Sequence, residues 1–99
     1  MTTIANLTKQ AIHDKFESRI KTVEAKLNTL KAHAETAKAN VELRAIAELL
    51  PKNQMMQQMV QELKKSEGSR WEQAKAEIEE GIGELENSAK EIEARAKES

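Results

Sequence analysis

The sequence predicts an all-α fold, an antiparallel helical hairpin or coiled coil with two breaks that assembles as a helical bundle. One long stretch has apolar residues at alternating spacings of four and three, which is the pattern of a helix packed along one stripe. Charged residues make up 33% of the 99 residues and aromatic residues only 2%. This composition is typical of long helices and coiled coils rather than of sandwiches or barrels.

The first predicted helix covers about residues 3–49. Its central part holds eight successive inner positions of a seven-residue repeat, and residues at such positions face a partner helix. We therefore predict that these eight side chains form a helix–helix interface. They are Phe16, Ile20, Val23, Leu27, Leu30, Ala34, Ala37 and Val41.

A first break is predicted near Pro51. Proline donates no backbone hydrogen bond, and it disfavours helical angles at the residue before it, here Leu50. Residues 52–66 then predict a shorter helix that carries a stripe of methionines, Met55, Met56 and Met59. Flexible thioethers adapt to varied partners, so this stripe is the candidate partner-binding surface; the other interpretation is a core or oligomer contact.

A second break is predicted near Gly68, which suits the left-handed residue after a helix end. Ser69 and Glu72 form a capping box for the last helix, residues 69–98. This helix returns to the seven-residue rhythm, and Trp71 at its start is predicted to anchor the hairpin end. Its predicted interface positions are Trp71, Ile78, Ile82, Leu85, Ala89 and Ile92.

Two arrangements of these helices fit the pattern. A turn at Pro51 gives two arms of equal length, whereas a turn at Gly68 leaves half of a long helix uncovered. Residues 1–50 carry a net charge of +2 and residues 69–99 a net charge of −4, which favours packing the two segments together. In both arrangements we expect a single all-helical domain, residues 1–99, that pairs with a second copy in a four-helix bundle.

Three segments carry a family resemblance: residues 26–39, residues 66–75 and the run from Ile78 to Leu85. Over residues 15–97 the chain resembles small, uncharacterised bacterial coiled-coil hairpin proteins of the cyanobacterial type, described as stress-related or apolipoprotein-like. The chain departs from that pattern at Pro51 and at the methionine stripe. Because the family has no established activity, the resemblance implies a coiled-coil hairpin and no particular chemistry.

The sequence predicts no catalytic, cofactor-binding or metal site. It contains no cysteine, Gly-rich phosphate loop or nucleophile elbow. Neither His13 nor His33 follows a glutamate by three residues, as di-iron bundles require. His13 could share a metal with Glu17 one turn on, but we interpret it as a solvated or inter-helix polar residue. We therefore expect a protein that is not an enzyme and needs no cofactor.

The leading functional hypothesis is a non-enzymatic coiled-coil scaffold or adaptor that acts through self-association and protein–protein contacts. The alternative is a stress-protective or lipid-surface-binding amphipathic protein that is partly disordered when free. A net charge of −1 argues against nucleic acid as a partner. The absence of cysteine and of a signal-peptide pattern at the start predicts a cytoplasmic location.

Overall fold

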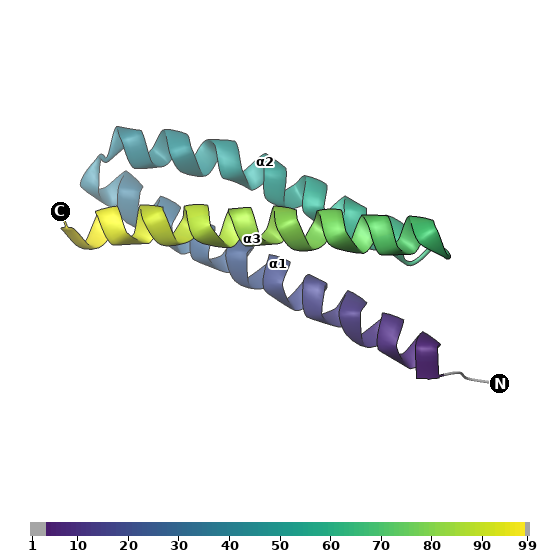
Figure 1. The fold of residues 1–99 in the computed structure, drawn as a ribbon. Coiled ribbons are helices and arrows are strands. Elements are labelled where there is room, and N and C mark those ends of the chain that lie inside the picture. The colour runs from purple at the N-terminus through teal and green to yellow at the C-terminus, as the bar shows by residue number, and fades with distance from the viewer. Residues whose placement is uncertain (1–3, 99) are drawn as a thin grey trace.

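The computed structural model describes residues 4–98, which form three α-helices packed against one another: α1 (Ile4–Ala37), α2 (Asn40–Leu63) and α3 (Ser69–Glu98). The helices run up, down and up, so that α1 and α3 are parallel and α2 is antiparallel to both (Figure 1). The resulting rod measures 55 × 18 × 16 Å. The predicted all-α class is confirmed, and the three helices pack against one another within a single chain.

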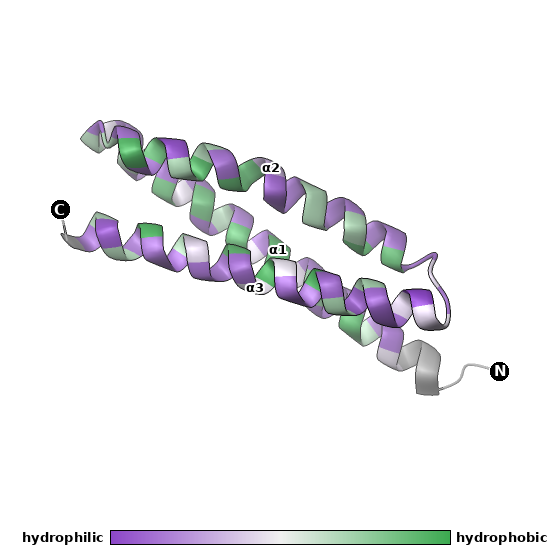
Figure 2. Ribbon diagram, turned by 45° about the horizontal axis from the view of Figure 1, so that its top comes forward, coloured by the Kyte–Doolittle hydropathy of each residue, from purple (hydrophilic) through white to green (hydrophobic). Residues whose placement is uncertain are grey.

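The core lies along the axis of the rod, where the seven-residue stripe of α1 meets α2 and α3. Apolar residues recur as bands along each helix (Figure 2). They form two clusters, one toward the α1–α2 turn around Leu27 and Ile46, and one toward the α2–α3 turn around Phe16 and Trp71. Met56 packs against both clusters. A single chain therefore covers the stripe that we expected a second copy to help cover.

The first turn lies at Lys38 and Ala39, which corrects the predicted helix over residues 3–49. Lys38 has a left-handed φ of 57°. The Lys38 N–H donates to the Glu35 carbonyl at 3.3 Å, and the Ala39 N–H donates to the Ala34 carbonyl at 2.9 Å. This is the Schellman pair of hydrogen bonds that usually has glycine at the left-handed position. Because lysine stands there instead, the sequence carried no glycine signal for the turn.

Pro51 lies inside α2 and does not interrupt the helix. This corrects the predicted break at Pro51 and the separate helix predicted over residues 52–66. Proline leaves the carbonyl of Ala47, four residues earlier, without its helical donor. Both Pro51 and Ala47 are exposed, so water can hydrate that carbonyl. The opposite side of α2 is held by buried Leu49 and Asn53. Packing on the inner side therefore outweighs the loss of one hydrogen bond on the outer side.

The second turn agrees with the sequence analysis. Helix α2 ends at Leu63, α3 begins at Ser69, and Gly68 between them has a left-handed φ of 61°. The Glu72 N–H donates to the Gly68 carbonyl at 3.3 Å, which closes the first turn of α3.

Two ion pairs join α1 to α3. Arg19 donates two hydrogen bonds to the Glu86 carboxylate, at 3.0 Å from Nε and 2.6 Å from Nη2. Lys26 Nζ lies 3.4 Å from Glu93 Oε2. In both pairs the partner is 67 residues further along the chain, so the seven-residue repeats of α1 and α3 run in parallel register. The positive residues 1–50 and the negative residues 69–99 thus contribute opposite charges to these ion pairs between α1 and α3.

We predict that Lys38→Gly stabilises the protein by about 0.5–1 kcal/mol, because glycine adopts the left-handed conformation without the steric cost that a side chain adds. Urea unfolding followed by circular dichroism measures the change. The matched control is Lys31→Gly in the exposed body of α1, which should lose about 1 kcal/mol. If Lys38→Gly destabilises as much as Lys31→Gly does, the turn is not at Lys38.

We predict that the Arg19–Glu86 pair stabilises the fold only above acidic pH. The hydrogen bond from Arg19 is the main reason that the pKa of Glu86 lies below its ordinary value of 4.5. A carboxyl group with a lowered folded-state pKa stabilises the fold above its unfolded pKa, and this contribution is lost as pH falls through the folded pKa. Glu86→Gln should therefore cost up to about 1 kcal/mol at pH 7 and close to nothing at pH 2.

Urea unfolding at both pH values provides the comparison, with the exposed Glu84→Gln as control. A cost for Glu86→Gln that is equal at the two pH values, or that Glu84→Gln reproduces, would contradict the role of the pair.

Candidate functional site

Twelve of the fourteen predicted interface side chains are buried between helices. Those of α1 and α3 meet apolar positions of α2 that the sequence analysis had not included in the interface. The buried set comprises Phe16, Ile20, Val23, Leu27, Leu30 and Ala34 of α1 and Trp71, Ile78, Ile82, Leu85, Ala89 and Ile92 of α3; the α2 positions are Ile46, Leu49, Val60 and Leu63.

The other two predicted interface residues, Ala37 and Val41, are exposed. The turn at Lys38 is the physical reason. Ala37 is the last residue of α1, and Val41 lies in the first turn of α2, where the reversed chain points it outward. The side chain of Val41 is 65% exposed. The repeat continues through this segment in the sequence, but the helix does not.

The methionine stripe is divided between the core and the surface. Met56 and Met59 are half-buried and pack against the apolar clusters, whereas Met55 is 58% exposed. Met56 fills the space that Gly81 of α3 leaves open, because a Cβ placed at Gly81 would lie 2.6 Å from the Met56 sulfur. Only Met55 of the three predicted partner-binding residues is thus free for a partner without rearrangement of the core.

Trp71 closes the end of the bundle at which α2 turns into α3. Its side chain is buried in the cluster around Phe16 and Leu63. The ammonium groups of Lys9 and Lys75 lie 5.2 and 5.7 Å from the ring centroid, within the range of cation–π attraction. These contacts favour a structural role for Trp71.

The exposed side of α2 presents one stripe, which we call the α2 outer face: Val41, Arg44, Glu48, Lys52 and Met55. Residues at spacings of three and four share one side of a helix. Among the described residues, Val41 and Met55 are the large hydrophobic side chains with the highest exposure. They lie at the two ends of this stripe, with alternating charges between them. This stripe is the candidate partner-binding surface of α2.

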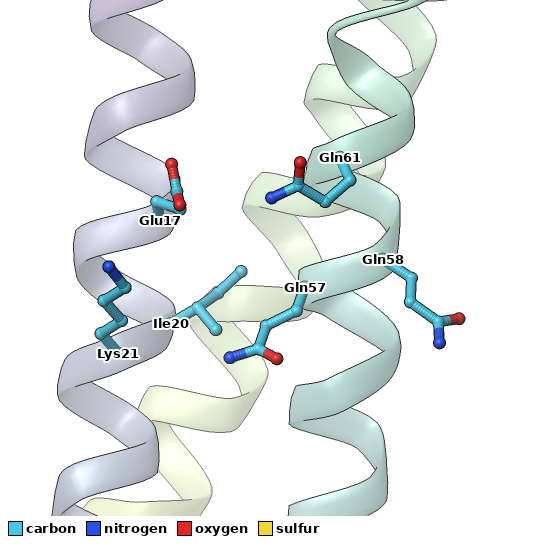
Figure 3. Close-up of a pocket in the computed structure, with 6 residues that line it drawn as sticks. All are labelled: Glu17, Ile20, Lys21, Gln57, Gln58 and Gln61. Carbon is cyan, nitrogen blue, oxygen red and sulfur yellow. The ribbon is translucent and has the colours of Figure 1, made fainter.

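A hollow between α1 and α2 is lined by Glu17, Ile20 and Lys21 of α1 and by Gln57, Gln58 and Gln61 of α2. Figure 3 shows Gln57 and Gln61 reaching toward α1, while Gln58 points away. Gln57 donates a hydrogen bond to the Glu24 carboxylate at 2.9 Å. The lining offers amides and one pair of opposite charges, which suit hydrogen bonding between helices.

His13 lies near the start of α1 and is 4% exposed. Its Nδ1 is 3.4 Å from Asp14 Oδ1 and 3.3 Å from Glu17 Oε2. Its Nε2 is buried and has no hydrogen-bond partner among the described residues. The sequence analysis paired His13 with Glu17 but missed Asp14. The other histidine, His33, is exposed.

No protein-family model, curated protein or solved structure matches this chain. The resemblance to bacterial stress-related hairpin proteins therefore stays a prediction. Within residues 4–98, no helix has the apolar length that crossing a bilayer requires.

The division of the methionine stripe generates a prediction for two glycines of α3. Gly83→Ala should stabilise the protein by about 0.5–1 kcal/mol, because alanine favours helix and no atom other than those of its chain neighbours and of its own helical backbone lies within 4 Å of the added Cβ. Gly81→Ala should gain less or lose stability, because its Cβ displaces the end of Met56. Chemical denaturation measures both.

The same two substitutions made in a Met56→Ala background provide the control. There the two alanines should stabilise equally, since the obstructing thioether is gone. A difference that persists without Met56 would show that another contact limits Gly81.

Proposed function

We propose that this protein is a non-enzymatic helical scaffold or adaptor, and that it acts by pairing with a second copy of itself through the α2 outer face. The observation that carries the proposal is the position of Val41 and Met55, which are both exposed and both lie on this one stripe. Apolar side chains that are exposed at the ends of a stripe are suited to anchor a helix–helix contact.

The charge distribution supports α2 as the contact helix. Five of its 24 residues are charged, against 14 of the 30 residues of α3. Residues 53–61 carry no charge at all. A charge that a partner covers must give up its hydration, so the three charges at the centre of the α2 outer face, Arg44, Glu48 and Lys52, need partners of opposite charge across the contact. With fewer charges per residue than α3, α2 has the surface that is less costly to cover.

Charge complementarity supports a second copy as the occupant. In an antiparallel pairing of two α2 helices, Glu48 of each copy can lie opposite Lys52 of the other, and the two-fold axis repeats this ion pair. The same register places Val41 of each copy beside Met59 of the other, one turn from Met55. The stripe is therefore complementary to itself in charge at Glu48 and Lys52, and Val41 contacts the part of the half-buried Met59 that the core leaves exposed.

The inner stripe of α1 is already covered within one chain. The proposed dimer therefore uses a different contact surface from the four-helix bundle that the sequence analysis expected. The residues of the inner stripe stay inside each three-helix bundle, and the α2 outer face makes the contact between the two copies. The lipid-surface alternative would instead need the inner apolar residues to leave the core, since few large hydrophobic side chains of the described residues are exposed.

Two charge reversals test the pairing. Glu48→Lys and Lys52→Glu should each be monomeric by sedimentation velocity at concentrations at which the unaltered chain is dimeric, because each variant opposes like charges across the interface. An equimolar mixture of the two variants should form a heterodimer, because every opposed pair then has opposite signs. Helicity measured by circular dichroism verifies that each variant remains folded.

The matched control is Ala25→Glu, which adds a charge at an exposed position of α1 and should leave the dimer intact. A monomeric unaltered chain at high micromolar concentration would refute the proposal, as would a mixture that stays monomeric. If neutral lipid vesicles raise the helicity of the chain, the lipid-surface alternative is favoured instead.

A further inference from the structure

One turn of α1 near its start brings three metal-ligating side chains together. The ligand atoms of His13, Asp14 and Glu17 all lie within 4.8 Å of one another. We propose that this cluster binds one divalent transition-metal ion of the Zn²⁺ type through His13 Nδ1 and one oxygen of each carboxylate. The proposal is independent of the α2 outer face.

The two separations from the His13 imidazole fit ligands that share an ion. Charge-assisted N–H···O hydrogen bonds are usually about 2.7–2.9 Å long. His13 Nδ1 lies 3.4 Å from Asp14 Oδ1 and 3.3 Å from Glu17 Oε2, which is long for such bonds. Two ligands that each lie about 2.0–2.1 Å from a tetrahedral zinc ion are about 3.3–3.4 Å apart. The structure therefore holds the imidazole nitrogen at the distance from each carboxylate that a shared ion requires.

Zinc binds a neutral imidazole through the lone pair of one ring nitrogen. In His13 this nitrogen is Nδ1, which faces one oxygen of each carboxylate. An ion at this point gives the three ligand atoms one common partner. The other nitrogen, Nε2, is buried without a hydrogen-bond partner among the described residues, so the site lacks the second hydrogen bond that commonly orients a ligating histidine.

The surroundings of the cluster suit an open metal site. Burial fixes the His13 ring, whose side chain is 5% exposed, while Asp14 is exposed and can be reached from solvent. Gln10 donates a hydrogen bond to Asp14 Oδ1 at 3.0 Å. Ligating carboxylates are commonly oriented by such a second hydrogen bond. Three protein ligands with one side open to water is the arrangement of zinc sites that keep a position for water or another ligand.

The second histidine provides an internal control. His33 is followed directly by Ala34 and, one turn on, by Ala37, so it has no carboxylate at the positions that Asp14 and Glu17 occupy relative to His13. A metal that binds histidine alone would bind both rings, and a metal that needs the cluster would bind only the first.

Isothermal titration calorimetry of the full chain with ZnCl₂ tests the proposal. We expect saturable binding of one ion per chain and a higher melting temperature with zinc, because an ion that binds only the folded state stabilises it. Glu17→Gln and His13→Asn should each weaken binding at least about tenfold, and His33→Asn should leave it unchanged. Glu17→Gln changes a partly exposed side chain, so the fold is retained.

Nitrogen NMR of the imidazole rings gives a second readout, since zinc should shift the Nδ1 resonance of His13 and not that of His33. Three results would each overturn the proposal: no saturable binding, an equal loss of affinity in His33→Asn and Glu17→Gln, or a zinc-induced shift at Nε2 of His13 in place of Nδ1.

Discussion

The burial of the apolar stripe of α1 is the constraint on which the rest of this structure depends. The stripe runs along most of a 34-residue helix, and a single partner helix would leave one of its sides in water. Helices α2 and α3 cover both sides from within the same chain. The hydrophobic gain, about 25 cal/mol per Å² of buried apolar surface, is thus obtained without a second copy. Association with another molecule has to use the outside of the bundle.

The two turns decide which side chains lie outside. Lys38 reverses the chain before the repeat of α1 is complete, and this exposes Val41. Pro51 lies on the solvent-exposed side of α2, where the missing backbone hydrogen bond destabilises the helix least. Between the two apolar clusters, Asn53 is buried and donates only a 3.4 Å hydrogen bond to the Ile20 carbonyl. Since a buried polar group with incomplete hydrogen bonding destabilises a fold, Asn53 lowers the stability of this level of the core.

The two candidate functional surfaces combine exposed side chains with a few that the bundle buries, of which His13 is the clearest case. The α2 outer face combines exposed apolar ends with alternating charges, and this pattern is the basis of the proposed self-pairing. The cluster at His13 combines one imidazole nitrogen with two carboxylates on one helical turn. The two surfaces lie on different helices and have different chemistry. A scaffold that pairs through one and binds an ion at the other would have two independent points of control.

The sequence alone determined the helical class, the buried stripes of α1 and α3 and the turn at Gly68, because each depends on local periodicity or on one residue's backbone preference. Only the tertiary structure decided that the first turn lies at Lys38 and that Pro51 stays within a helix, since packing energy there overrides local preference. It also decided that Asp14 joins His13 and Glu17, and that α2 faces outward at Val41 and Met55. Those features depend on the direction in which each helix turns toward its neighbours, and an apolar repeat does not specify that direction.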